Sequence, residues 1–332
     1  MSKNPFSVYD FLGYAIPGAL TLYILKYIQF SLVSEYVDVL FDVENKNTVF
    51  YILCFIVSSY VIGHLVNYLS SITVELFSIW CYGYPSDYLY KTPKAFRYFH
   101  RKTISRPSSY SIHKLKNNEP IRGKIKNNNR YKTLTKFIYC IPIICKLIAR
   151  IILLLLLFPL AVGYLLLALI ASISGFTIVK PMSRNNWSYL NLMWNHFVKC
   201  SNLSIDNLDK PQDNYRLITN YVYENFTIAS RKLDNYVALY GFTRSMAFIF
   251  SSLFTYNLIS WIFNNWDYEW YFDFSVLLSF QCIIGLTATI FYFAFIKFFR
   301  RYTHESFMNF ITITVKKKYE HTNNRYTWLC RE

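Results

Sequence analysis

One long apolar stretch carries polar side chains whose types could handle protons or water. Four of them recur at intervals of four, three and four residues, so a helix places them on one face. They are Tyr60, His64, Asn67 and Ser71. Inside a membrane, an ionisable residue is costly and usually functional, and an imidazole titrates near neutral pH. This polar stripe either lines a water path or cross-links neighbouring helices by hydrogen bonds.

Other residue patterns do not assemble a catalytic set. His196 and Cys200 have the i,i+4 spacing of metal ligands, but no second pair accompanies them. Arg106 and His113 have the loose spacing of a HEPN ribonuclease motif, within a Ser/Pro/Lys-rich loop where such spacing arises by chance. The sequence contains no Gly-rich phosphate loop, no HExxH and no nucleophile elbow. We therefore expect a protein without enzymatic activity, metal or cofactor.

The composition is that of a membrane protein. Of 332 residues, 54% are hydrophobic and only 16% are charged, whereas soluble domains carry about a quarter charged residues. The apolar residues come in blocks long enough to span a bilayer, which takes roughly 20 residues. Seven scattered cysteines are typical of free thiols rather than of a disulfide framework.

A strongly basic stretch over residues 84–136 separates these apolar blocks. It holds fourteen Lys and Arg against two acids, and such segments stay on the cytoplasmic side. Its predicted basic face comprises Arg97, Arg101, Lys102, Arg106, Lys114, Lys116, Arg122 and Lys124. Anionic lipid headgroups are the expected partner of this face; a nucleotide signal, nucleic acid or a soluble protein are the alternatives.

Charge also orients the rest of the chain. The segments 34–47 and 264–273 are acidic and belong outside, whereas the polar segments 84–136, 180–244 and 300–332 are basic and belong in the cytoplasm with both termini. The predicted organisation is a transmembrane pair whose second helix extends into the cytoplasm, the basic loop, a hydrophobic hairpin, a cytoplasmic helical region, a second transmembrane pair and a basic tail. Their ranges are 1–83, 84–136, 137–179, 180–244, 245–299 and 300–332.

The apolar block 137–176 is constrained by this orientation. Because the polar segments on both sides of it are cytoplasmic, it crosses an even number of times or not at all. Lys146 and Arg150 within its first half favour a re-entrant or interfacial hairpin, broken near Pro159. The expected fold class is all-α: a polytopic membrane protein with four transmembrane helices, this hairpin and cytoplasmic helices. Six spans are the alternative.

Three arginines are placed to fix the spans at the cytoplasmic headgroups. Arg244 immediately precedes one span, and Arg300 and Arg301 follow the last one. Arg244 could also meet Glu75 at the end of the second helix.

Three short stretches give a resemblance. They are Tyr9-Asp-Phe-Leu-Gly-Tyr-Ala-Ile-Pro-Gly18, Gly63-His64 followed by Ser70-Ser71, and Tyr240-Gly-Phe-Thr-Arg-Ser245. Together they resemble a diffuse group of mostly uncharacterised bacterial multi-pass membrane proteins. Some small membrane proteins of this kind act as effectors or partners in anti-phage defence, which the resemblance carries to this chain as an expectation.

These observations lead to three functional hypotheses. The first is a bacterial inner-membrane effector, gated by a cytoplasmic signal, that alters membrane permeability. The second is a membrane scaffold that recruits a soluble cytoplasmic partner. The third is a channel or facilitator for a small solute, which would need several copies to enclose a pore.

Overall fold

The computed structural model describes most of the predicted helices but only residues 84–91 of the basic loop. The described residues are 11–28, 48–91, 145, 147–174, 179–201, 210–264 and 274–329. Every secondary-structure element in these ranges is a helix, which confirms the all-α fold class. The basic face, the acidic segment 34–47 and the loop over 265–273 lie outside the described residues.

Three helical runs in the described part of the chain are long and apolar enough to cross a membrane. They are Val49–Tyr90, Ser230–Phe263 and Leu278–Lys317; a fourth is added if the bent pair Leu147–Leu156 and Phe158–Ser174 forms one span. The first predicted span is described over Phe11–Ile28, about 27 Å of helix, close to the hydrocarbon thickness of a bilayer.

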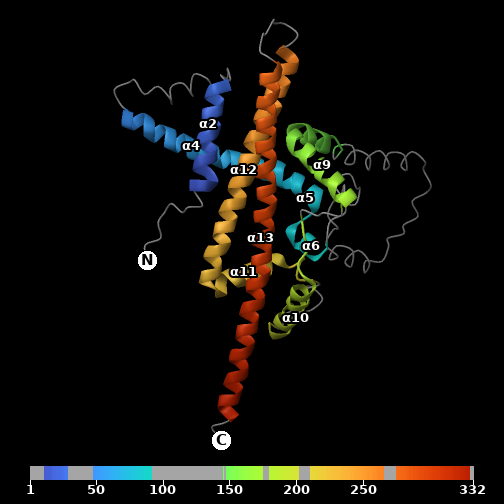
Figure 1. Ribbon diagram of the computed structural model, residues 1–332. Helices are drawn as coiled ribbons and strands as arrows, with labels where there is room; N and C mark the ends of the chain where they lie inside the picture. Colours follow the sequence, from blue (N-terminus) through green and yellow to red (C-terminus); the bar gives the residue numbers. More distant parts are fainter. Residues whose placement is uncertain are drawn as a thin grey trace, which may run out of the picture.

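Two long helices form the axis of the molecule (Figure 1). α12 covers Thr227–Asn264 and α13 covers Phe274–Leu329, and they run side by side. At 56 residues α13 is about 84 Å long, far more than a bilayer requires. The spans predicted at 246–264 and 274–298 are therefore the upper parts of helices that continue into a second, polar-surfaced half.

The second predicted span is an almost unbroken helical run that lies across α12 and α13 at a large angle (Figure 1). It consists of α4 (Thr48–Ser70), a π-helical turn η2 (Ser71–Glu75) and α5 (Leu76–Tyr82). Gly83 ends it with φ 91°, a conformation that favours glycine. The stretch Tyr82-Gly-Tyr-Pro-Ser-Asp87 predicts a turn, because Gly and Pro stop a helix. The turn is shorter than this pattern predicts, since Pro85 starts a further short helix, α6 (Pro85–Tyr90).

The first span packs against α4 at very short range. It begins as a π-helical turn, η1 (Phe11–Ala15), and continues as α2 (Ile16–Ile28). The wider turn lies where the ring of Pro17 would otherwise meet a carbonyl of the preceding turn. A Cβ on Gly18 would overlap the Ser59 backbone, and one on Gly63 would overlap the Tyr14 backbone. Small residues thus set this crossing, as in many membrane helix pairs.

Within the apolar block 137–176, predicted as a hairpin, the described residues 147–174 form a sharply bent helix pair. Its arms, Leu147–Leu156 and α9 (Phe158–Ser174), meet at 99° beside Pro159. The neighbouring helices satisfy the carbonyls at the bend: Thr255 Oγ1 donates to the Leu156 carbonyl at 3.0 Å, and Thr289 Oγ1 donates to the Pro159 carbonyl at 3.4 Å. A break bonded in this way belongs inside the protein.

Below the bundle, α10 (Arg184–Cys200) and α11 (Tyr215–Asn225) pack on α13 (Figure 1). Aromatic side chains fill this helical head: Phe310 contacts the rings of Trp194, Phe197 and Tyr221 at centroid distances of 6.2, 5.5 and 5.7 Å. Phe310 itself is fully buried. The head corresponds to the helical region predicted over 180–244, joined by the extensions of both long helices.

Candidate functional site

A buried arginine joins α12 to the crossing helix. Arg244 is only 7% exposed, and its guanidinium forms an ion pair with the Glu75 carboxylate. It also donates to the Asn67 side-chain oxygen at 2.8 Å and, through Nε, to the Ser70 hydroxyl at 3.2 Å. The predicted meeting of Arg244 with Glu75 is confirmed. We call Arg244, Glu75, Asn67 and Ser70 the arginine cluster.

The π-helical turn helps to bring Glu75 into this cluster. Each residue of a π turn advances by less than the roughly 100° of an α-helix, so η2 rotates Glu75 back toward the face of Asn67. Three hydroxyls loosen the helix here by bonding to carbonyls of their own chain. Ser70 bonds to Asn67, Ser71 to Tyr68 and Thr73 to Leu69, each at 2.7 or 2.8 Å. Such back-bonding competes with the regular helix ladder.

The anchor role predicted for Arg244 needs a correction. Its guanidinium contacts the protein rather than lipid headgroups, because Glu75 and Asn67 supply an anion and an acceptor within the bundle. Tyr240, one turn earlier, adds its ring at 6.0 Å from the guanidinium carbon. Arg300 is half-buried, with its Nε donating to the Lys180 carbonyl at 3.0 Å, and Arg301 is exposed. For these two residues the anchor role stays a prediction.

The polar stripe does not act as one unit. Tyr60 and His64 belong to an aromatic group in which the His64 ring stacks on Tyr14 with centroids 3.8 Å apart. Asn67 belongs to the arginine cluster. The Ser71 hydroxyl bonds to the Tyr68 carbonyl of its own helix, and it is Ser70 that accepts a hydrogen bond from Arg244. The cross-linking alternative therefore describes Asn67 better than a continuous water path does.

Sequence reasoning missed Ser70 and Tyr14 as members of this region. Both belong to the stretches that carry the resemblance, and the structure brings all three stretches together. Gly18 and Gly63 set the distance between α2 and α4, while Ser245 lies beside Ser70, with their hydroxyl oxygens 3.5 Å apart. The signal that could have identified Ser70 and Tyr14 was their membership of the three stretches that carry the resemblance.

His196 and Cys200 do form a pair, although no third ligand joins them. The Cys200 sulfur lies 3.0 Å from His196 Nδ1 on α10. No group of three or more potential metal ligands occurs among the residues that the structure describes. The pair is therefore a local contact within one helix.

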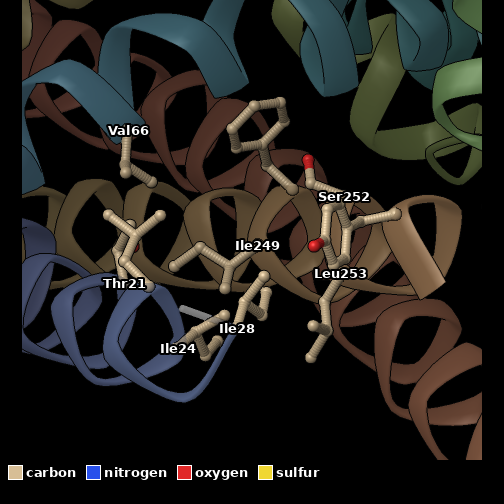
Figure 2. A pocket seen from close by; sticks show the side chains of 10 residues that line it. Thr21, Ile24, Ile28, Val66, Ile249, Ser252 and Leu253 are labelled. Atoms are coloured by element: carbon tan, nitrogen blue, oxygen red, sulfur yellow. The ribbon is translucent and has the colours of Figure 1, made fainter. Parts of the chain in front are cut away.

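The bundle beside the arginine cluster also contains an apolar groove. It lies between α2, α4 and α12, has a volume of about 210 Å³, and includes Val66, the neighbour of Asn67 (Figure 2). Its lining offers almost no polar surface and so provides no route for ions. The polar chemistry of this part of the bundle is concentrated at the arginine cluster.

Fold and site together define a multi-pass, all-helical membrane protein in which a buried arginine forms an ion pair with a partly exposed glutamate of another helix. Comparisons with protein-family models, with curated proteins and with solved structures gave no match to this chain.

Proposed function

We propose that the chain is a non-enzymatic bacterial inner-membrane protein that receives a cytoplasmic signal and responds by changing membrane permeability. The signal would act on the basic face and the helical head, and the response would serve anti-phage defence. The carrying observation is that α12 runs without a break from the head to Arg244, which is bonded to the crossing helix. A displacement of the head is thereby linked mechanically to the bundle.

The energetics of a buried ion pair support this coupling. A buried charge that loses its partner is strongly destabilised, so the arginine cluster has a paired state and a costly unpaired state. Moving α12 relative to α4 would separate Arg244 from Glu75 and leave the buried Arg244 charge without its anion. Water entry would then stabilise the separated charges, and a hydrated bundle is a permeable one.

Membrane potential in living cells, read with a voltage-sensitive dye, tests the proposal. Cells expressing the wild type should depolarise on phage infection, whereas cells expressing the double variant Glu75→Met and Arg244→Met should not. The double variant replaces the ion pair with apolar side chains of similar length, so it should still accumulate in the membrane.

Two further variants sharpen this experiment. His64→Ala removes a stacked ring but leaves the arginine cluster, and Lys199→Gln changes an exposed cation of the head; both should respond like the wild type. A normal potential in wild-type cells, infected or not, would contradict the proposal. Loss of the response in His64→Ala alone would move the permeation path to the polar stripe.

A scaffold is the second candidate, favoured by one observation on the head. Tyr189 and Leu192, neighbours on one face of α10, are 59% and 57% exposed although the head lies outside the predicted spans. A large apolar pair facing water is typical of a partner contact. If Tyr189→Ser with Leu192→Ser removes a stoichiometric partner from pull-downs while wild-type cells never depolarise, the scaffold replaces the effector.

A further inference from the structure

The groove between α2, α4 and α12 has a linear shape. On α2 it is lined by Thr21, Ile24, Leu25 and Ile28, and on α12 by Phe248, Ile249, Ser252, Leu253 and Tyr256, with Val66 of α4 at one end. The positions recur every three to four residues on both helices, so each helix contributes one face over about two turns. Figure 2 shows Ile24 and Ile28 of α2 facing Ile249 and Leu253 of α12.

The chemistry of the lining excludes water and polar solutes. A water molecule needs two to four polar partners to occupy a cavity. Of the two small hydroxyls that line the groove, Thr21 already donates to the Pro17 carbonyl at 2.8 Å, and Ser252 Oγ is buried without a hydrogen-bond partner. All the other lining residues except Tyr256 are hydrocarbon side chains.

The position of the groove indicates which kind of molecule can enter it. Its floor is tightly packed, since Val66 and Ile249 are buried, whereas the residues along α2 are half-buried and Tyr256 is exposed. The groove therefore opens sideways between two predicted spans, where the surrounding solvent is lipid hydrocarbon. An empty apolar void costs packing energy, and the molecule at hand to fill it is a flexible linear chain.

We propose that this groove binds one acyl chain of a membrane phospholipid, which joins α2 to α12. The groove holds the chain beside Val66 and Ile249, so the lipid lies next to the helix pair that carries the arginine cluster. It is a discrete site, distinct from the annular lipid that covers the exposed apolar residues of α4. This inference does not depend on the proposed function, and either can fail alone.

Photo-crosslinking tests the site. The full chain is purified in membrane nanodiscs containing a phospholipid with a diazirine on one acyl chain, and the labelled peptides are mapped by mass spectrometry. The wild type should label mainly on Thr21–Ile28 and Phe248–Tyr256. Ile249→Trp, which fills the floor of the groove, should reduce this labelling at least five-fold.

Matched variants keep the test decisive. Ile259→Trp adds the same ring to an exposed position of α12 outside the groove and should label like the wild type. Ser252→Leu fills the groove with a smaller change, so it reports even if Ile249→Trp does not fold. Labelling that spreads evenly over α4, or that survives both filling variants, would mean annular lipid only. A crosslink to a second protein chain would likewise overturn the proposal.

Discussion

The head and the membrane bundle bury their side chains in different ways. In the head, aromatic rings from the three helices α10, α11 and α13 meet around Phe310 and Phe307, both fully buried. Polar tips close its edges: Tyr215 bonds to Ser306 at 3.2 Å, and Lys317 donates to Asn225 at 2.6 Å. Burial raises the pKa of the Tyr215 hydroxyl, which therefore stays protonated. The head is therefore held together by close packing of buried aromatic rings.

On the α2–α4 side of the bundle, the large apolar side chains are mostly exposed and small residues form the contact between the helices. Most large apolar residues of α4 point outward, including Val61 and Leu65, and the contact with α2 depends on Gly18 and Gly63. Its strongest specific interaction is the ion pair of Arg244 with Glu75. Without water outside, apolar burial drives little association, so close packing and polar bonds must hold the helices together. Four substitutions can break or sharpen this comparison.

The largest effect is expected in the head. Phe310→Ala should lower the free energy of unfolding by about 4 kcal/mol, because the ring leaves a cavity among three other aromatic residues. Val61→Ala, an equally apolar but outward-facing position on α4, should change it by no more than about 0.5 kcal/mol. Unfolding titrations in detergent measure both. Similar losses would mean that α4 is packed against protein rather than lipid.

The ion pair should come next. Glu75→Gln leaves Arg244 buried without its anion and should lower the free energy of unfolding by about 3 kcal/mol. Adding Arg244→Met to Glu75→Met should recover most of that loss, since an apolar pair needs no compensation. The same titrations report the recovery. If the double variant is less stable than Glu75→Gln, the ion pair makes a net contribution to stability that apolar side chains cannot replace.

The close crossing of α2 and α4 should give an intermediate effect. Gly63→Ala should lower the free energy of unfolding by about 2 kcal/mol, because the new methyl meets the Tyr14 backbone. The same change at Gly241, where no atom lies within 4 Å of the added methyl, should instead stabilise by about 0.5–1 kcal/mol. Opposite signs of the stability change at the two glycines would confirm that Gly63 is the one in close contact with another helix. Equal signs would contradict that contact.

The smallest effect concerns the bend of the hydrophobic pair. Thr255→Val removes the hydroxyl that bonds the Leu156 carbonyl and should cost about 0.6 kcal/mol, the average for interhelical hydrogen bonds in membranes. Thr287→Val is the matched control, since Thr287 bonds only to its own helix. Cysteine accessibility along Leu147–Leu156 should rise in Thr255→Val alone. Unchanged accessibility would mean that packing and the remaining hydrogen bonds, from Ser251 to the Leu156 carbonyl and from Thr289 to the Pro159 carbonyl, are enough to hold the bend.

Much of the fold followed from the chain itself. The apolar blocks gave the long helices, Gly83 and Pro85 gave the end of α5 and the start of α6, and Pro159 gave the bend beside Leu157. These signals are local in the sequence. The length of an apolar block lies within one segment, and the positive φ of Gly83 and the missing N–H of a proline act within about one helical turn. The spacing of Ser7 and Asp10 is typical of a capping box for the first helix, but both residues lie outside the described part of the chain.

The site could be predicted only in pieces. The spacing that grouped Tyr60, His64, Asn67 and Ser71 assumed a regular α-helix, and the π-helical turn at Ser71–Glu75 changes the register just where the cluster forms. Glu75 is thereby turned toward Arg244, which also meets Ser70, a residue that the spacing did not include. The spacing of residues along one helix also cannot predict a contact with Tyr14, which lies on a different helix.

By itself, the sequence determined an all-helical, multi-pass membrane protein, because apolar length and charge asymmetry act through the solvent and need no partner residue. Only the tertiary structure decided that Arg244 is buried against Glu75, that Gly63 meets Tyr14, and that α2 and α12 leave an apolar groove between them. Each of these depends on which helices cross and at what distance. That geometry is set by contacts between residues far apart in the chain, such as Arg244 and Asn67, which are 177 positions apart, and no local sequence pattern predicts such contacts.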